Sequence, residues 1–241
     1  MTELVIPARL NGPPTTANGG VSAGLLAGHL PSCATIQVTL RRPPLLDTAM
    51  RVDVDGPAAQ LFNGADLVAE AQVVDDAAVG EAVPAVDLDA ARLAAAGFDG
   101  RTDHPFPTCF VCGTSRAARD GLEVFAGPVE GDRHLVAAPL VMKPIHRPPF
   151  VPAPEVLGWA ALDCPSGWAC GLPGRPAVLG RLTAQVSRAP QPGETCVVVG
   201  QLDRWEGRKA FSRSTLYGPD GTEYARASSI WIEIARRSPS R

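Results

Sequence analysis

Hydrophobic residues recur at helical spacing in two segments of the chain. In residues 19–30 they lie four positions apart on one face, and the pattern stops before Pro31. Residues 154–170 are apolar at most positions and include Pro165. Proline has no N–H to donate, so we expect Pro165 to kink this helix or to end its regular part. The pattern predicts two largely buried helices.

Polar and apolar residues alternate in the segments that follow each predicted helix, as in strands with one buried face. The predicted strands are 35–40, 49–54, 66–74, 122–125, 134–138, 180–188, 195–203, 209–217 and 224–234, with a hairpin turn at 218–221. A short helix is expected at 87–96, capped by Asp87 and ended by Gly97. A helix lying across a curled antiparallel sheet is an α+β unit.

The two halves of the chain read as loose copies of one such unit. Residues 35–54 and 182–201 share a strand, a proline-containing turn and a second strand. We therefore predict an α+β fold of two antiparallel sheets, each wrapped around a central helix. The sheets could pair edge to edge and so cover their open edges. The predicted N-terminal repeat is 1–83, the linker with the short helix is 84–104, and the C-terminal repeat is 105–241.

Composition and charge limit the class of partner. With 241 residues, 45% hydrophobic and 20% charged, the chain can bury a substantial core. The net charge of −3 is spread along the sequence and leaves no basic face for nucleic acid or an anionic membrane. No apolar run approaches the roughly 20 residues of a membrane span, and the start lacks a secretory signal. We expect a cytoplasmic protein with reduced thiols.

The two predicted helices carry complementary polar features. The first opens with Asn18, Gly19 and Gly20 but contains no acid, whereas the second contains Asp163 but has no glycine opening. Burying a carboxylate without a partner is costly, so an aspartate in an apolar helix favours a functional role. The purely structural alternatives are that Asn18 caps its helix and that Asp163 bonds backbone freed by Pro165. The division of features predicts one shared site.

The segment Cys109-Phe110-Val111-Cys112-Gly113, followed by Gly121 and Leu122, resembles the opening of hotdog-fold thioesterases of the phenylacetic-acid-degradation type. These belong to the acyl-CoA thioesterase superfamily. Such proteins continue into a His-Gly-Gly helix start with an acid about two turns later. Here Asn18-Gly19-Gly20 looks like a variant of that start, with asparagine in place of histidine, and Asp163 looks like the acid. The resemblance implies a tandem, or double, hotdog protein.

The resemblance also implies a site between the repeats. Gly19 would be the oxyanion donor, Asn18 its polar neighbour, and Asp163 a general base or nucleophile. A helix start offers unpaired N–H groups and a partial positive charge, and Gly20 would let the substrate approach it closely. The chemistry that these groups support is hydrolysis of a thioester.

The expected function is that of an acyl-CoA thioesterase-like hydrolase with one live site and no cofactor beyond the coenzyme A of its substrate. The mirror site would pair Glu155 with Ala27 and would lack both glycine opening and helix carboxylate. Candidates to meet the coenzyme A phosphates are Arg147 and Arg181, with Lys143. The alternative is a non-catalytic acyl or acyl-CoA-binding hotdog protein, and a homodimer of double hotdogs is also considered. A hydratase would need Asp and His close together at a helix start.

The cysteines raise a metal or thiol interpretation. Cys109 and Cys112 have the spacing of half a zinc site, and His104 is a candidate third ligand. The remaining cysteines form no second closely spaced pair, so we expect no metal. The resemblance implies a structural turn in which the cysteines are buried as small apolar groups. Cys164 is disfavoured as a nucleophile because the neighbouring carboxylate of Asp163 would raise its thiol pKa.

Overall fold

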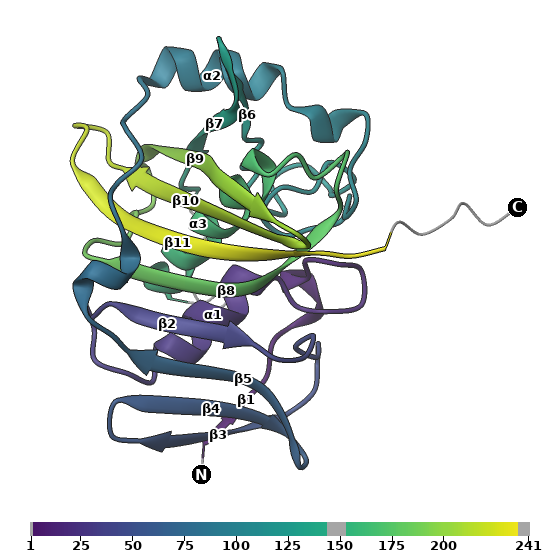
Figure 1. The fold of residues 1–241 in the computed structure, drawn as a ribbon, viewed down its shortest axis with the longest axis vertical. Coiled ribbons are helices and arrows are strands. Elements are labelled where there is room, and N and C mark those ends of the chain that lie inside the picture. The colour runs from purple at the N-terminus through teal and green to yellow at the C-terminus, as the bar shows by residue number, and fades with distance from the viewer. Residues whose placement is uncertain (1, 144–152, 236–241) are drawn as a thin grey trace, which may run out of the picture.

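Eleven antiparallel strands form one continuous sheet in the computed structural model, which describes residues 2–143 and 153–235 (Figure 1). The strands are β1 Thr2–Leu4, β2 Ile36–Leu40, β3 Met50–Asp55, β4 Ala58–Asn63, β5 Asp66–Val73, β6 Gly127–Val129, β7 Asp132–Val141, β8 Ala177–Val186, β9 Thr195–Glu206, β10 Lys209–Tyr217 and β11 Glu223–Glu233. The helices are α1 Gly19–Ala27, α2 Leu88–Ala96 and α3 Pro154–Ala169, with short 3₁₀ helices at Ala8–Leu10, Asp76–Val79 and Asp99–Arg101.

Strand order confirms the internal repeat. Outward from the middle of the sheet, one half runs β2-β5-β4-β3-β1 and the other runs β8-β11-β10-β9-β7-β6. In each half the first strand after the central helix pairs with the last strand. The strand that precedes the helix pairs with the second strand after it. The two halves therefore have the same topology, and β6 is an addition to the second.

The halves are joined through β2 and β8, which pair along four residues, from Ile36 opposite Ala184 to Thr39 opposite Arg181. The two predicted sheets thus pair edge to edge, as expected, and this pairing makes them one continuous sheet. The physical reason is the edge: each strand would otherwise expose unpaired backbone groups at the end of its own sheet. The α+β class and the central helix of each repeat are confirmed.

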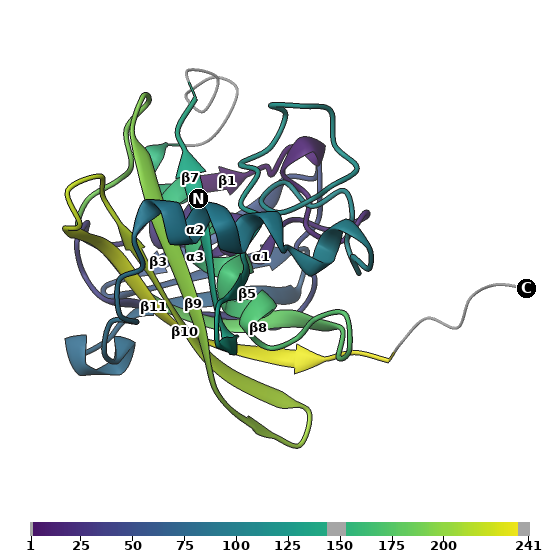
Figure 2. The same cartoon turned by 90° about the horizontal axis from the view of Figure 1, so that it is seen from above.

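Helices α1 and α3 pack against each other on the face around which the sheet curls (Figures 1 and 2). Glycine sets how closely they approach. A Cβ atom on Gly20 would lie 2.6 Å from Asp163 Cβ and 2.7 Å from the Trp159 carbonyl oxygen, and one on Gly24 would lie 2.8 Å from Trp159 Cβ. A side chain at either position would force the helices apart. The residues of the two helices that face each other are buried in the main core.

Helix α3 continues past Pro165 to Ala169, close to the predicted limit of residue 170, so the proline does not end the helix. Two hydroxyl groups bond carbonyl oxygens in the turn around this proline. Ser214 Oγ on β10 donates to Leu162 O at 2.7 Å, and Ser166 Oγ donates to Asp163 O at 2.7 Å. Proline offers no N–H to the carbonyl oxygen of Ala161, four residues earlier, and the two hydroxyl groups add bonds to the next two carbonyl oxygens of this turn.

The linker runs across the outer face of the second half. Val83 donates its N–H to Thr215 Oγ1 at 2.9 Å and thereby ties the linker to β10. Helix α2 begins after Asp87, whose carboxylate accepts from Ala90 N at 2.8 Å, and it ends at Gly97, as predicted. It packs with the linker and the sheet in a second, smaller cluster of Val83, Ala91, Ala94, Ala137, Val197 and Val199.

The strand predictions differ from the structure in two ways. Residues 122–125 are not a strand: Leu122 and Val124 donate their N–H groups to Phe110 O and Val111 O, so this stretch pairs with a loop. The sequence did not reveal β1, β4 or β6, of which β4 is connected to its neighbours by very short turns. Gly56 and Gly64 adopt positive φ angles of 53° and 59° in these turns, which glycine allows at low cost.

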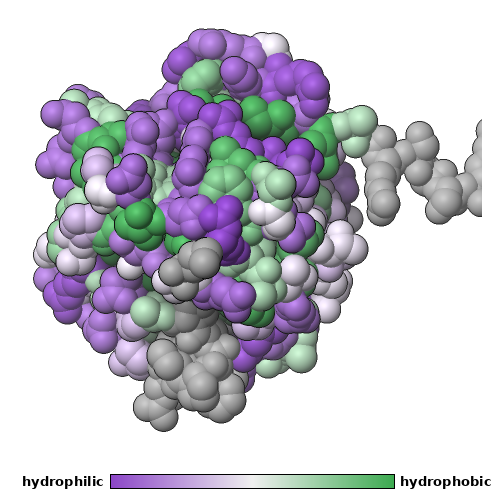
Figure 3. Space-filling model, turned by 90° about the horizontal axis from the view of Figure 1, so that it is seen from below, coloured by the Kyte–Doolittle hydropathy of each residue, from purple (hydrophilic) through white to green (hydrophobic). Residues whose placement is uncertain are grey.

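Within the described residues, no helix is both long and apolar enough to cross a membrane. The face seen from below carries hydrophobic residues in small groups among polar ones (Figure 3). Single exposed apolar side chains such as Val5 and Val54 are ordinary for protein surfaces.

Candidate functional site

The start of α1 faces Asp163 of α3. Asn18 caps α1 by accepting from Val21 N at 2.9 Å through its side-chain oxygen. Its Nδ2 donates to Asp163 Oδ2 at 3.0 Å, and the backbone N–H of Gly20 donates to the same oxygen at 2.8 Å. Within the described residues, no acceptor lies at the N–H of Gly19. The helix start thus holds one carboxylate oxygen and keeps one donor available.

Burial dominates the electrostatics of Asp163, whose side chain is almost completely inaccessible to solvent. Loss of water disfavours the charged form and raises the pKa of Asp163 to about 7, although the hydrogen bonds from Gly20 and Asn18 act in the opposite direction. Oδ1 has no hydrogen-bond partner among the described residues. One oxygen of this carboxylate is therefore fixed, and the other can bond a ligand.

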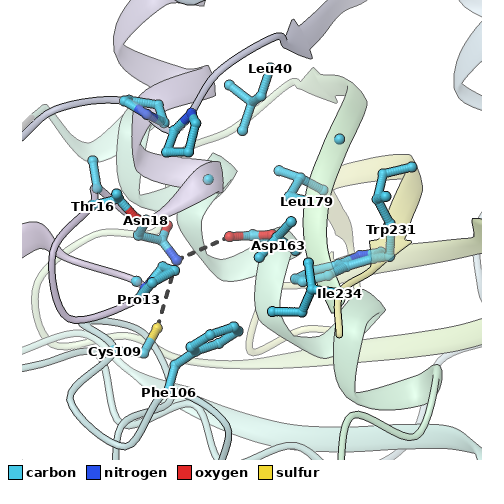
Figure 4. Close-up of a pocket in the computed structure, with 18 of the residues that line it drawn as sticks. Pro13, Thr16, Asn18, Leu40, Phe106, Cys109, Asp163, Leu179, Trp231 and Ile234 are labelled. Atoms are coloured by element: carbon cyan, nitrogen blue, oxygen red, sulfur yellow. Dashed lines mark hydrogen bonds between the residues drawn. The ribbon is translucent and has the colours of Figure 1, made fainter. Parts of the chain in front are cut away.

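An apolar cavity of about 450 Å³ opens beside these groups, which is a common size for small-molecule sites. Asn18 and Asp163 point toward each other in its wall (Figure 4). Both repeats contribute apolar side chains to the lining, including Leu40, Phe106, Cys109, Leu172, Val178, Leu179, Trp231, Ile232 and Ile234. The cavity is therefore a composite of the two halves, and Asn18 and Asp163 place polar groups in its wall at the start of α1.

Trp231 links the cavity wall to the helix that bears the carboxylate. Its indole N–H donates to Ser166 Oγ at 2.9 Å, and Ser166 Oγ donates to Asp163 O at 2.7 Å. This chain of bonds fixes β11 against α3 directly behind the site. The sequence predicted Trp231 only as part of an alternating strand and gave it no role in the site.

Two arginines that local patterns did not single out, Arg41 and Arg42, also line the cavity. They follow β2 and pair with Glu70 and Asp66, respectively. Their side chains are 51% and 60% exposed, so these ion pairs are worth little and a phosphate can compete for them. The cavity therefore has cationic groups at a solvent-exposed part of its rim.

Two of the other residues predicted to bind substrate, Gly20 and Arg181, do not line the apolar cavity. Gly20 packs against α3, and its N–H donates to Asp163 Oδ2. Arg181 donates to Thr39 Oγ1 at 3.1 Å and lines a polar hollow that it shares with Gln37, Glu70 and Gln72, away from the apolar cavity. Arg147 lies outside the described residues, and Lys143 pairs with Glu123. Among the described residues, the arginines that line the cavity are Arg41 and Arg42, which follow β2.

Three cysteines meet beside Asn18. Cys164 Sγ lies 3.4 Å from Cys112 Sγ and 3.8 Å from Cys109 Sγ, and all three side chains are buried and line the cavity. Asn18 Nδ2 lies 3.7 Å from Cys109 Sγ and 3.9 Å from Cys164 Sγ. His104 is not part of this cluster: its Nδ1 accepts from backbone, so its Nε2 donates to the Cys112 carbonyl at 3.0 Å.

The cysteines influence one another's ionisation. Thiol hydrogen bonds from Cys112 and Cys164 hold the pKa of Cys109 well below its ordinary value. Donating to Cys109 raises the pKa of Cys164. The direction expected for Cys164 is therefore correct, but its cause is the other cysteines rather than Asp163.

Comparison with known proteins shows what this architecture is similar to. No family model matches the chain, and no curated protein matches it. A hot dog fold protein of unknown function from Alicyclobacillus acidocaldarius is 11% identical, with a TM-score of 0.62 over 98% of this chain and 93% of that one. This agreement over the full length, together with the repeated topology, decides the architecture. The fold is a double hotdog.

Two further structures are similar to this chain over nearly its full length. Acyl-CoA thioesterase II TesB2 from Mycobacterium marinum is 12% identical, with a TM-score of 0.56 over 97% of this chain and 93% of that one. The tesB protein of Mycobacterium avium subs paratuberculosis is 11% identical, with a TM-score of 0.57 over 96% and 91%. At such identities the likeness concerns the fold, and the chemistry has to come from the site itself.

The pseudo-symmetric mirror site of this double hotdog lacks the same groups. Helix α1 contains no acidic residue, and α3 starts after Ala153, which offers no capping side chain. Glu155, in the first turn of α3, is exposed. Among the described residues, the pairing of an open glycine helix start with a buried helix carboxylate therefore occurs on the Asn18 side of the helix pair.

Proposed function

We propose that this protein is a thioester hydrolase of the acyl-CoA thioesterase class with one composite site. The observation that carries the proposal is the position of Gly19 and Asp163 on one apolar cavity, each with a polar group free for a ligand. The fold it shares with acyl-CoA thioesterase II supports the same class. A buried donor and a buried acceptor side by side match the needs of acyl transfer.

In the proposed reaction, the thioester carbonyl oxygen accepts a hydrogen bond from the N–H of Gly19. Negative charge that develops on this oxygen is stabilised by the helix start, an effect worth about 3–4 kcal/mol per donor in well-studied hydrolases. Asp163 Oδ1 takes a proton from a water molecule as the water oxygen attacks the carbonyl carbon. The carbon–sulfur bond then breaks, and the thiolate leaves with that proton.

Asn18 and Gly20 act through Asp163 rather than on the substrate. Their hydrogen bonds hold Oδ2, so the carboxylate cannot rotate and Oδ1 stays directed away from them. The apolar lining receives the acyl group. Arg41 and Arg42 are placed to bind the phosphates of coenzyme A, because arginine forms strong charge-assisted bonds with phosphate oxygens.

Replacing Asp163 by Asn tests this proposal. Asparagine keeps the shape of the side chain and an oxygen that can accept from Gly20 and Asn18, but it cannot take a proton. With acyl-CoA substrates of graded chain length and detection of free thiol, kcat should fall by about 10²–10⁴-fold. Asp89→Asn on the exposed face of α2 is the matched control and should retain full activity.

Other outcomes have definite meanings. A wild-type protein that binds acyl-CoA without releasing thiol is the non-catalytic acyl-binding protein that is the alternative function. A wild-type protein that neither binds nor hydrolyses any member of the series refutes both. The cytoplasmic location and the homodimer stay predictions from the sequence.

A further inference from the structure

The three clustered thiols have the geometry of a metal-binding site. An ion bonded to sulfur at about 2.3 Å in tetrahedral geometry separates neighbouring sulfur atoms by about 3.8 Å. Here Cys164 Sγ is 3.4 Å and 3.8 Å from the other two sulfurs, and the three sulfur atoms all lie within 4.8 Å of one another. An ion can therefore contact all three sulfur atoms after shifts of at most about 1 Å.

The arrangement of the chain supports this interpretation. Cys109 and Cys112 are separated by two residues, the usual spacing of a zinc-binding pair, and lie on one loop. Cys164 comes from the rigid helix α3 and supplies the third sulfur from the opposite side. Hydrogen bonds support the loop, including Gly113 N to Cys109 O at 2.8 Å. Ligands that are held before the ion arrives lose little freedom when it binds.

The surroundings suit sulfur that carries negative charge. Asn18 Nδ2 is directed at two of the three sulfur atoms, and donors of this kind stabilise metal-bound thiolates. The positive end of α1 lies beside the cluster, since Asn18 is its N-cap. All three cysteines line the cavity, so an ion has a route from solvent and a position open for water.

We propose that Cys109, Cys112 and Cys164 bind one thiophilic metal ion of the Zn²⁺ or Cu⁺ class at the wall of the cavity. Binding breaks up to three S–H bonds, releases those protons to solvent and forms three sulfur–metal bonds. Three protein ligands leave a coordination position on the cavity side. Sulfur ligands select against Mg²⁺ and Ca²⁺, which prefer oxygen. The site does not depend on thioester hydrolysis.

Metal titration of the full-length protein tests the proposal. The protein is reduced, stripped with a chelator and titrated with Zn²⁺ against a chromophoric competitor, and Co²⁺ is used as a spectroscopic probe. We expect one Zn²⁺ per chain and a thiolate-to-cobalt charge-transfer band. Cys109→Ser, Cys112→Ser and Cys164→Ser should each weaken binding by at least about 100-fold. Cys196→Ser, buried on β9 outside the cluster, is the matched control and should bind like wild type.

A second readout uses the wild-type chain and does not require any variant to fold. Bound Zn²⁺ or Cu⁺ should protect these three of the six cysteines from alkylation, as mapped by mass spectrometry. Failure to bind one ion per chain, or protection of other cysteines, refutes the site. A disulfide between Cys112 and Cys164 in a protein that takes up no metal also refutes it. Asp163→Asn separates this proposal from the proposed function, because it removes hydrolysis and leaves the three sulfur atoms in place.

Discussion

Gly20→Ala tests whether the contact of the two central helices creates the site. The new Cβ would lie 2.6 Å from Asp163 Cβ and 2.7 Å from the Trp159 carbonyl oxygen. Carbon atoms in contact normally lie about 3.5–4.0 Å apart, so the helices have to separate by about 1 Å. Both neighbours belong to α3, one of them to its backbone, so neither can move aside as a flexible side chain could.

This separation has a cost in stability and a larger one in activity. Overpacking costs about 1–3 kcal/mol, and weakening the 2.8 Å bond from Gly20 N to Asp163 adds to it. We expect a loss of about 2–3 kcal/mol, which lowers Tm by roughly 4–12 °C in a chain of this size. A displacement of about 1 Å at Asp163 should reduce kcat by about 10²-fold.

Calorimetry and the free-thiol assay measure both effects, and Gly28→Ala is the matched control. A Cβ on Gly28 would lie 3.5 Å from its nearest neighbours, the carbonyl oxygens of Gly24 and Leu25, and its φ of −61° suits alanine. That variant should be as stable as wild type or up to about 1 kcal/mol more stable. If Gly20→Ala melts at the wild-type temperature with full activity, the helix contact described above is incorrect.

Two further predictions concern substrate recognition and the proline turn of α3. The double variant Arg41→Ala, Arg42→Ala should raise KM for an acyl-CoA about tenfold or more while leaving KM for an acyl thioester of N-acetylcysteamine unchanged, because the latter has no phosphates. Arg181→Ala is the control. If the control and the double variant change KM equally for either substrate, Arg41 and Arg42 do not bind the phosphates. Ser214→Ala should leave Leu162 O without its 2.7 Å bond and lower the free energy of unfolding by about 1–3 kcal/mol in denaturant titration, whereas an unchanged midpoint would show that the bond is dispensable.

Local sequence patterns were sufficient for most of the secondary structure. The alternation over 209–217 predicted β10 at its observed bounds, and Asp87 and Gly97 marked the ends of α2. Strand alternation and helix caps depend only on a residue and its near neighbours in the sequence, so a single sequence is enough to predict them. The same patterns did not reveal the bond to the Leu162 carbonyl oxygen, since the hydroxyl of Ser214 arrives from a distant strand.

The sequence predicted the separate polar groups of the candidate site but not how they are arranged. The glycine start at Asn18 and the carboxylate of Asp163 stood out because each is unusual in an apolar helix. Their hydrogen bond, the free oxygen Oδ1 and the place of Arg41 at the cavity depend on how the helices cross and where the sheet curls.

The sequence by itself determined the repeated α+β unit and the two polar features that the helices carry. Hydrophobic periodicity encodes which face of an element is buried, so it specifies the elements and their repetition. Only the tertiary structure decided that β2 pairs with β8, that one carboxylate oxygen stays free, and that Cys164 joins Cys109 and Cys112. Contacts between residues more than fifty positions apart depend on packing distances, which no local pattern records.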